Sequence, residues 1–155
     1  MRDGWWIEIN MSLKMSRCEK NYIFRPCSHE ELNRIIKLFA FTDCSWHIIS
    51  PDYMDGLEII EDKDNEIIAL IYYDPYRNEN CEMFIMQFEV RGDLRRKGHG
   101  KLIIKQFLRE HAISAELLPQ SEESVLFWRA CGFKGDRYGL YYYPRSLNTR
   151  KMKKS

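Results

Sequence analysis

The chain has 155 residues, of which 45% are hydrophobic and 30% are charged, and its formal net charge is +1. That length and hydrophobic content indicate one globular domain with a packed core, and they exclude a fibrous or wholly disordered chain. No apolar run approaches the length of a membrane span, and the N-terminus lacks the basic-then-apolar order of a signal peptide. We therefore expect a cytoplasmic protein without a membrane partner.

The small net charge hides an uneven distribution. The last eleven residues contain no acid and five bases, which are Arg145, Arg150, Lys151, Lys153 and Lys154. The other 144 residues carry 19 basic and 23 acidic groups, a net charge of −4. A body of that sign argues against a general nucleic-acid binder. The basic tail, residues 146–155, is either a solvated disordered segment or a contact for RNA or another acidic surface.

The five cysteines are widely spaced and form no Cys-x-x-Cys pair; they are Cys18, Cys27, Cys44, Cys81 and Cys131. Their odd number and spacing favour reduced thiols. Zinc sites usually draw ligand pairs from tight spacings, so we expect no metal.

The chain divides into three parts. Residues 1–19 show no sustained period, and we interpret them as an N-terminal extension in which Trp5 and Trp6 pack either on the domain or on a partner. Residues 20–145 form the expected domain, and residues 146–155 form the tail. Asn21 to Arg25 predicts the first strand of the domain.

A helix is predicted after this strand. Ser28 followed by Glu31 forms a capping box, in which each residue satisfies a backbone donor of the other. The next apolar residues recur at helical spacing and predict one buried stripe; they are Leu32, Ile35, Ile36 and Phe39. Residues 42–56 are irregular and suit a surface loop or a short helix.

Three β-rich runs come next. Leu57 to Glu61 and Glu66 to Tyr73 are joined by four polar residues, which predicts a hairpin. A second turn leads into the third run, Cys81 to Val90. Because this run feeds directly into a loop rich in glycine and arginine, it is the strand that positions the candidate site.

The loop from Arg91 to Gly100 joins that strand to a helical pattern at Lys101 to His111. The first turn of a helix has N–H groups without intrahelical partners and carries partial positive charge, so it attracts anions. Gly98 and Gly100 have no Cβ and allow a ligand to approach the main chain. Arg95, Arg96 and Lys97 add cationic donors, and His99 is expected to contribute only its N–H. The loop therefore predicts a phosphate site.

The remaining pattern predicts a strand, a helix and a last strand. Ile113 to Leu118 is apolar, and Ser121 is a good N-cap for a helix that runs to Cys131. Gly132 stands where a helix end favours a left-handed residue. The aromatic segment Tyr138 to Pro144 predicts the last strand.

Two of these segments resemble signatures of the GNAT superfamily of acyltransferases. Arg95-x-x-Gly98-x-Gly100 is similar to its coenzyme A pyrophosphate loop, Gln/Arg-x-x-Gly-x-Gly/Ala. Ser121 to Phe133 resembles its second signature, Asn-x-x-Ala-Ile-x-Phe-Tyr-x-x-x-Gly-Phe. The resemblance covers residues 22–144. It implies an α+β fold whose mixed, mostly antiparallel sheet of six to seven strands splays at the fourth strand, with helices on both faces.

The resemblance also implies an activity and a set of ligand contacts. The activity is acetyl-CoA-dependent N-acetylation of a primary amine in a small molecule or a peptide, by a monomer or homodimer. The resemblance also implies that residues 42–56 line the acceptor side, where acidic groups such as Asp43 and aromatic groups such as Trp46 would suit an amine; the alternative is an ordinary surface loop. Main-chain groups of Phe88 and Val90 are expected to pair with the pantetheine arm. The full set of expected acetyl-CoA contacts is Phe88, Glu89, Val90, Arg95, Arg96, Lys97, Gly98, His99, Gly100, Lys101, Ser121 and Trp128.

Direct transfer needs a neutral amine, so a carboxylate or a chain of water molecules must accept a proton. Glu82 and Glu89 are the strand candidates for that role. Strict alternation places Glu82 on the face of Phe88 and Val90, with Glu89 on the other face. For each glutamate the alternative is a solvent-exposed structural carboxylate.

The departing thiolate needs a proton or a strong donor, and many members of the superfamily use the tyrosine of the Phe-Tyr pair. Here Trp128 occupies that position, and an indole N–H is no acid at neutral pH. Ser124, Tyr138 or Tyr141 substitutes, or the thiolate leaves unassisted. The alternative function is a non-catalytic acyl-CoA-binding module that acts through a protein or RNA partner.

Overall fold

The computed structural model describes residues 22–49, 55–75 and 81–144. The predicted extension with Trp5 and Trp6 and the basic tail lie outside the described residues, as do residues 76–80 of the second predicted turn, which begins at Asp74. No helix in the described part of the chain is long and apolar enough to cross a membrane.

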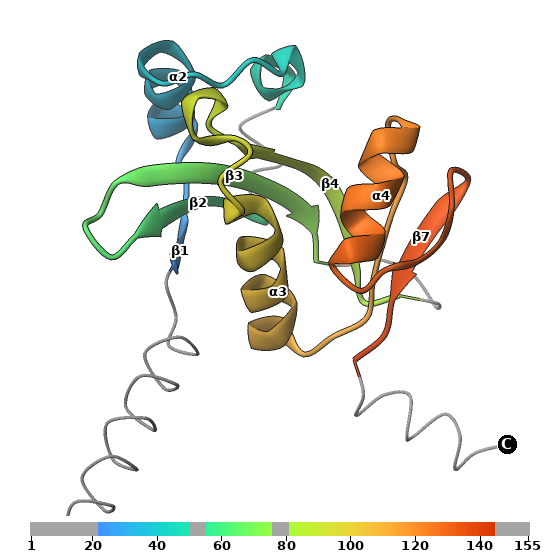
Figure 1. Ribbon diagram of the computed structural model, residues 1–155. Helices are drawn as coiled ribbons and strands as arrows, with labels where there is room; N and C mark the ends of the chain where they lie inside the picture. Colours follow the sequence, from blue (N-terminus) through green and yellow to red (C-terminus); the bar gives the residue numbers. More distant parts are fainter. Residues whose placement is uncertain (1–21, 50–54, 76–80, 145–155) are drawn as a thin grey trace, which may run out of the picture.

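The described strands form one sheet of seven (Figure 1). In chain order they are β1 (Tyr22–Pro26), β2 (Leu57–Asp62), β3 (Ile67–Asp74), β4 (Met83–Val90), β5 (Ala115–Leu117), β6 (Lys134–Asp136) and β7 (Gly139–Tyr142). The order across the sheet is β1-β2-β3-β4-β5-β7-β6, and every pair is antiparallel except β4 with β5. This confirms the predicted α+β class with a mixed, mostly antiparallel sheet.

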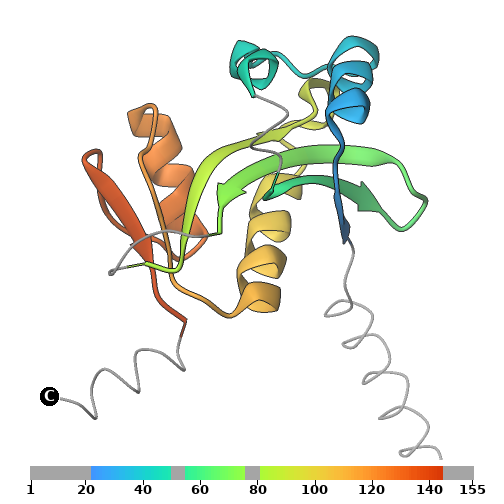
Figure 2. The same cartoon turned by 180° about the vertical axis from the view of Figure 1, so that it is seen from behind.

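Helices cover both faces of the sheet, as predicted (Figures 1 and 2). They are α2 (His29–Leu38), the short 3-10 helices η1 (Cys44–Ile48) and η3 (Gly92–Leu94), α3 (His99–His111) and α4 (Glu122–Ala130). Leu32 of α2 and Trp46 of η1 belong to a smaller core on one face. Phe107 of α3 and Val125 of α4 belong to the larger core on the other.

Local capping sets the helix starts, largely as the sequence predicts. The Oγ of Ser28 accepts the N–H of Glu31 at 3.1 Å, and the Oγ of Ser121 accepts the N–H of Ser124 at 3.0 Å. The other half of the predicted capping box is wrong, because the Glu31 carboxylate binds Arg25 at 2.8 Å instead of returning to Ser28. Gly132 has the predicted left-handed backbone, with φ +104°.

A bulge in β4 reverses the alternation of its side chains. Tyr72 pairs with Gln87 and the next residue, Tyr73, pairs with Ile85, so Met86 is the extra residue. Met83 and Ile85 consequently join the core that Phe88 and Val90 pack against. The prediction that Glu82 shares the face of Phe88 and Val90 is therefore wrong, because one inserted residue shifts every earlier side chain to the other face.

Two strands depart from their predicted form. β5 has three residues where six were expected; it pairs with β4 at two positions and with β7 at three. β6 was not predicted, since all three of its residues are exposed and carry no alternating pattern. It pairs with β7 through Gly135, whose φ of +127° favours glycine.

Candidate functional site

A hollow of about 290 Å³ lies over the N-terminal end of α3. Its lining includes Val90 at the end of β4, Phe127 of α4, and the cationic residues Arg95, Arg96 and Lys101. The first N–H groups of α3 have no intrahelical acceptor and carry partial positive charge. Main-chain donors and cations therefore surround one space, which suits a phosphate group.

The two glycines of the loop are required for different reasons. Gly98, the N-cap of α3, has a left-handed backbone with φ +83°, and an added Cβ would meet no atom within 4 Å. At Gly100 an added Cβ would stand 3.1 Å from Cε2 of Phe127. Close packing of α3 on α4 thus requires Gly100, in addition to any ligand approach that the sequence predicts.

Two predicted members of the loop, Lys97 and His99, differ from the other polar residues, although His99 lines the hollow. Lys97 is exposed and does not line the hollow. The imidazole of His99 shares a hydrogen bond of 2.7 Å with the hydroxyl of Tyr22 on β1, through Nδ1. The ring of His99 is therefore held by β1, whereas its main-chain N–H remains at the start of α3.

A cleft of about 400 Å³ continues from the hollow between β4 and α4. It exists because β4 and β5 pair only through Met83 and Phe84, after which the two strands diverge. This divergence is the splay predicted at the fourth strand. Arg95 and Phe127 line both spaces, so the hollow and the cleft adjoin each other.

The edge of β4 along this cleft offers main-chain groups. The N–H of Arg91 donates to the carbonyl oxygen of Ile68 on β3 at 2.8 Å. Main-chain groups alternate in direction along an antiparallel strand, so those of Val90 and Phe88 face the cleft. The Nε of Arg95 donates to the Val90 carbonyl at 3.2 Å. An extended ligand can therefore pair with Phe88 and with the N–H of Val90 as an added strand.

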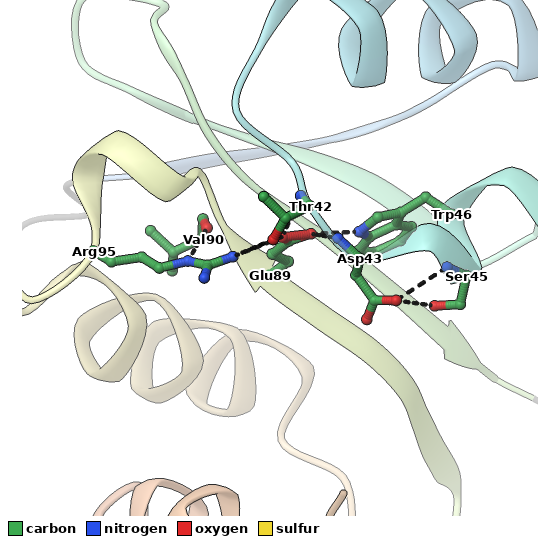
Figure 3. Close-up of polar contacts among 7 residues, drawn as sticks. All are labelled: Thr42, Asp43, Ser45, Trp46, Glu89, Val90 and Arg95. Atoms are coloured by element: carbon green, nitrogen blue, oxygen red, sulfur yellow. Dashed lines mark hydrogen bonds and ion pairs between the residues drawn. The ribbon is translucent and has the colours of Figure 1, made fainter.

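Glu89 lies on the other face of β4 and is 7% exposed (Figure 3). Its carboxylate accepts five hydrogen bonds from residues that the structure describes. Oε1 accepts from Asp43 N–H (3.1 Å) and Trp46 Nε1 (2.9 Å), and Oε2 accepts from Thr42 N–H (3.0 Å), Thr42 Oγ1 (3.3 Å) and Arg95 Nη2 (2.8 Å). A solvent-exposed Glu89 was therefore a wrong expectation. Its oxygens are engaged, so the structure does not support Glu89 as a free general base either.

The segment that Glu89 holds places Asp43 in the wall of the cleft. The Ser45 N–H and hydroxyl donate to Oδ1 of Asp43 at 3.0 and 2.7 Å. Burial raises the pKa of Asp43, but the Ser45 hydrogen bonds and the nearby Gln87 amide outweigh it, so the net pKa is lowered. Asp43 is therefore ionised at neutral pH.

Helix α4 forms the opposite wall of the cleft, with Ser121, Ser124 and Trp128 among its lining residues. Trp128 is 8% exposed, and its ring packs edge-on against Phe88 at 6.0 Å between centroids. Among the described residues the Trp128 indole N–H has no hydrogen-bond acceptor. The structure thus brings all three predicted α4 residues to the cleft.

Three other predicted catalytic residues do not line the cleft. Glu82 precedes β4 and exchanges hydrogen bonds with Ser114, one from its own N–H and one to its carboxylate. Tyr138 is 72% exposed in a separate hollow beside α4, next to Arg137. Tyr141 lies in a third hollow, on β7. Their predicted roles in proton transfer are not supported by these positions.

Asp43, one of the acidic residues of the 42–56 segment that the resemblance implies on the acceptor side, lines the cleft. Sequence reasoning missed Gln87 and Glu123, which line it too. For Gln87 the sequence carries no signal, since its place depends on the bulge at Met86.

Comparison with solved structures gives matches to acetyltransferases. They include histone acetyltransferase HPA2 and related acetyltransferase from Corynebacterium glutamicum (TM-score 0.56, 11% identity, covering 81% of this chain and 97% of that one). A second is the Bacillus subtilis N-acetyltransferase YlbP in complex with coenzyme A (0.52, 15%, 79% and 95%). A third is the NatC complex bound to Gag peptide and CoA (0.51, 17%, 81% and 99%). At these identities the likeness shows the fold.

A search of curated proteins found no match. The sequence profile of the acetyltransferase (GNAT) family, however, matches residues 25–133, which is more than half of the chain. That stretch runs from the end of β1 to the residues after α4, and it includes the hollow, the β4 edge and the Trp128 wall. The chain belongs to the GNAT acetyltransferase family.

Proposed function

We propose that this protein is an acetyl-CoA-dependent N-acetyltransferase that transfers the acetyl group directly to a primary amine. The observation that carries the proposal is that the cationic hollow at α3 adjoins the cleft along the open edge of β4. The expectation of a cytoplasmic enzyme that needs no metal belongs to the same proposal.

The residues present fit coenzyme A as a substrate. Its pyrophosphate would take the N–H groups of α3 together with Arg95, Arg96 and Lys101. Its pantetheine amides would pair with Phe88 and Val90 on β4. Solved structures of similar fold support this placement, since YlbP is described in complex with coenzyme A and the NatC complex with a peptide and CoA.

The reaction balances without a covalent enzyme intermediate. The amine nitrogen attacks the thioester carbonyl carbon, a C–N bond forms, and the C–S bond breaks with its electron pair leaving on sulfur. An ammonium substrate releases two protons in all; one ends on the thiolate and the other in water. The cleft is open, so water is the proton acceptor that the structure supports in place of Glu82 or Glu89.

Helix α4, which forms the wall opposite β4, supplies the side chains beside the leaving thiolate. Trp128 has no acidic proton, so we assign it the role of filling space beside Phe88. Ser124 lines the cleft, and its hydroxyl is a candidate donor of a hydrogen bond to the leaving sulfur. A thiol of pKa about 8.5 is a tolerable leaving group even with weak assistance.

The second candidate is a module that binds acyl-CoA without turnover. The replacement of the usual tyrosine by Trp128 is the observation that favours it. Both candidates require the hollow and the cleft, so binding alone does not separate them.

Thermal unfolding with and without acetyl-CoA tests the shared part of the proposal. A ligand that binds only the folded state raises Tm by mass action, so 1 mM acetyl-CoA should raise Tm, whereas adenine should not. Release of free thiol from acetyl-CoA across a panel of amines tests turnover. A Tm shift without amine-dependent thiol release would establish the binding module, and the lack of any shift would refute both candidates.

A further inference from the structure

The side of α4 that faces away from the cleft carries exposed apolar side chains. Leu126 is 67% exposed, and Tyr138, in the turn between β6 and β7, is 72% exposed. Both line a separate hollow of about 420 Å³, together with the buried Val125. We call the residues that line this hollow the outer patch. Adjoining exposed apolar groups with a polar rim mark an interaction surface.

The charges of the outer patch cancel. Its remaining members are two acids, Glu122 and Asp136, and two bases, Arg129 and Arg137. A partner of a single sign would meet as much repulsion as attraction at this rim. A surface that holds both signs can instead be complementary to a rotated copy of itself, as a two-fold interface requires. The charge pattern therefore favours a second copy of this chain.

The order of residues along α4 has the form that two-fold pairing needs. Glu122, Leu126 and Arg129 are all exposed, and their spacing of i, i+4 and i+7 puts them on one stripe of the helix. With a rise of 1.5 Å per residue, Glu122 lies about 6 Å before Leu126 and Arg129 about 4.5 Å after it. A two-fold axis at Leu126 would therefore bring Glu122 of one copy opposite Arg129 of the other, twice.

Both charged groups are available for such a pair. Within the described residues, neither Glu122 nor Arg129 belongs to an ion pair. The Nε of Arg129, at 3.0 Å, and its Nη2 donate to the carbonyl oxygen of Gly135. These bonds hold the guanidinium in place beside Leu126, so less side-chain freedom would be lost on association.

Tyr138 is also held in its exposed position. The guanidinium of Arg137 lies 4.9 Å from the centre of the Tyr138 ring, and its Nη2 donates to the hydroxyl at 2.6 Å. The N–H of Tyr138 donates to Oδ1 of Asp136 at 2.8 Å. Tyrosine and arginine are the residue types most often found where protein interfaces are tightest. The β6–β7 turn thus extends the apolar centre of the patch beyond Leu126.

We propose that the protein forms a homodimer through the outer patch, with Leu126 at the two-fold axis and Glu122 of each copy paired with Arg129 of the other. The α4 residues that line the cleft are different ones, among them Ser124 and Trp128. Each copy therefore keeps its own cleft open in the dimer. The proposal does not depend on the proposed function.

Sedimentation equilibrium of the full chain tests the dimer. Between about 5 and about 200 μM protein we expect a monomer–dimer equilibrium with a micromolar Kd. Leu126→Lys keeps helix propensity but sets two like charges at the axis, so it should raise Kd by at least about thirtyfold. Leu38→Lys is the matched control, at a leucine of α2 that is 69% exposed, and should leave Kd unchanged.

Charge reversal tests the pairing itself. Glu122→Arg and Arg129→Glu each put like charges into both pairs, so either variant alone should dimerise about tenfold more weakly. An equimolar mixture of the two restores opposite charges in both pairs and should form a heterodimer with nearly the wild-type Kd. The thermal unfolding of each variant, measured at about 2 μM where the monomer predominates, shows whether it is folded.

A wild-type chain that stays monomeric at about 200 μM would overturn the proposal. So would an unchanged Kd in Leu126→Lys, or a mixture of the charge variants that associates no better than either alone. Leu126→Lys should keep the wild-type Tm shift with acetyl-CoA, since Leu126 lines neither the cleft nor the hollow over α3. Failure of the dimer and failure of the proposed function are thus read from different measurements.

Discussion

The indole Nε1 of Trp46 donates a buried hydrogen bond of 2.9 Å to Oε1 of Glu89, across 43 residues of sequence. Trp46 is 1% exposed and Glu89 is 7% exposed, so both partners are withdrawn from water. A hydrogen bond to a buried charge is costly to remove, because the carboxylate cannot turn to solvent instead. This bond therefore fixes η1 against β4.

Trp46→Phe removes that donor and keeps an aromatic ring in the smaller core. We expect the free energy of unfolding to fall by about 2 kcal/mol, the range for hydrogen bonds to charged groups. Denaturant unfolding measures it, with His47→Phe, at an exposed neighbouring position, as control. A loss below about 0.5 kcal/mol would mean that the other four donors compensate Glu89 fully.

Arg95 and Arg96 should separate stability from coenzyme A binding. Arg95 pairs with the buried Glu89 at 2.8 Å, so Arg95→Ala should lower both stability, by about 1–3 kcal/mol, and acetyl-CoA affinity. Arg96 is exposed and lines only the hollow, so Arg96→Ala should lower affinity alone, by roughly tenfold. Calorimetric titration with acetyl-CoA and denaturant unfolding give the two quantities. Unchanged affinity in Arg96→Ala would place the phosphates elsewhere.

Trp128→Phe tests the space-filling role of the indole. The variant should keep most of the activity, because an aromatic ring still packs beside Phe88 and no acid is lost. If the N–H instead binds the leaving sulfur, kcat should fall by roughly tenfold. Thiol release under saturating substrates distinguishes the two results. A gain of activity in Trp128→Tyr would show a site still arranged for acid catalysis, whereas complete loss in Trp128→Phe would refute our assignment.

At pH values above the ordinary pKa of a carboxyl group, Glu58→Gln should be more stable than the wild type. Oε2 of Glu58 is buried and has no hydrogen-bond partner among the described residues. The pKa of Glu58 is raised, and burial is the largest cause. The hydrogen bond from the Tyr73 hydroxyl lowers the pKa, and the nearby charge of Glu110 raises it further. The folded state thus binds the proton more tightly, so this contribution to stability is complete below pH 4.5, the ordinary pKa, and is lost as pH rises through the raised pKa.

The expected result is a Tm that is higher than wild type by a few degrees at pH 7.5, with the difference vanishing below about pH 4.5. Thermal unfolding from pH 4 to pH 8 measures it. Glu122→Gln, at an exposed position, should show no such pH dependence. A Tm difference independent of pH would refute the assignment to Glu58 ionisation.

Patterns confined to one element were predictable from the sequence. Ser28 and Ser121 were identified as caps because an N-cap depends on the next three residues. The mixed, mostly antiparallel sheet and its splay came through the resemblance, carried by the loop at Gly98 and the segment that ends at Phe133. The caps and the two sequence signatures can be identified without knowing which strands pair with each other.

Features that depend on pairing between distant segments were not predictable. The bulge at Met86 arises from the register of β3 on β4, so alternation along β4 alone put Glu82 on the wrong face. The burial of Glu89 depends on donors from residues 42–46, far away in sequence. Tyr138 was plausible by type, yet the β6–β7 turn carries it away from the cleft.

The extra residue in β4 bears on how this chain is to be aligned with its relatives. A relative whose fourth strand is regular has one residue fewer between the positions of Ile85 and Gln87. An alignment without a gap at Met86 would then match core-facing Ile85 with a residue of the opposite face, and the error would extend back through Met83. Substitution patterns for this strand are therefore comparable between proteins only when the two sides of Met86 are aligned separately.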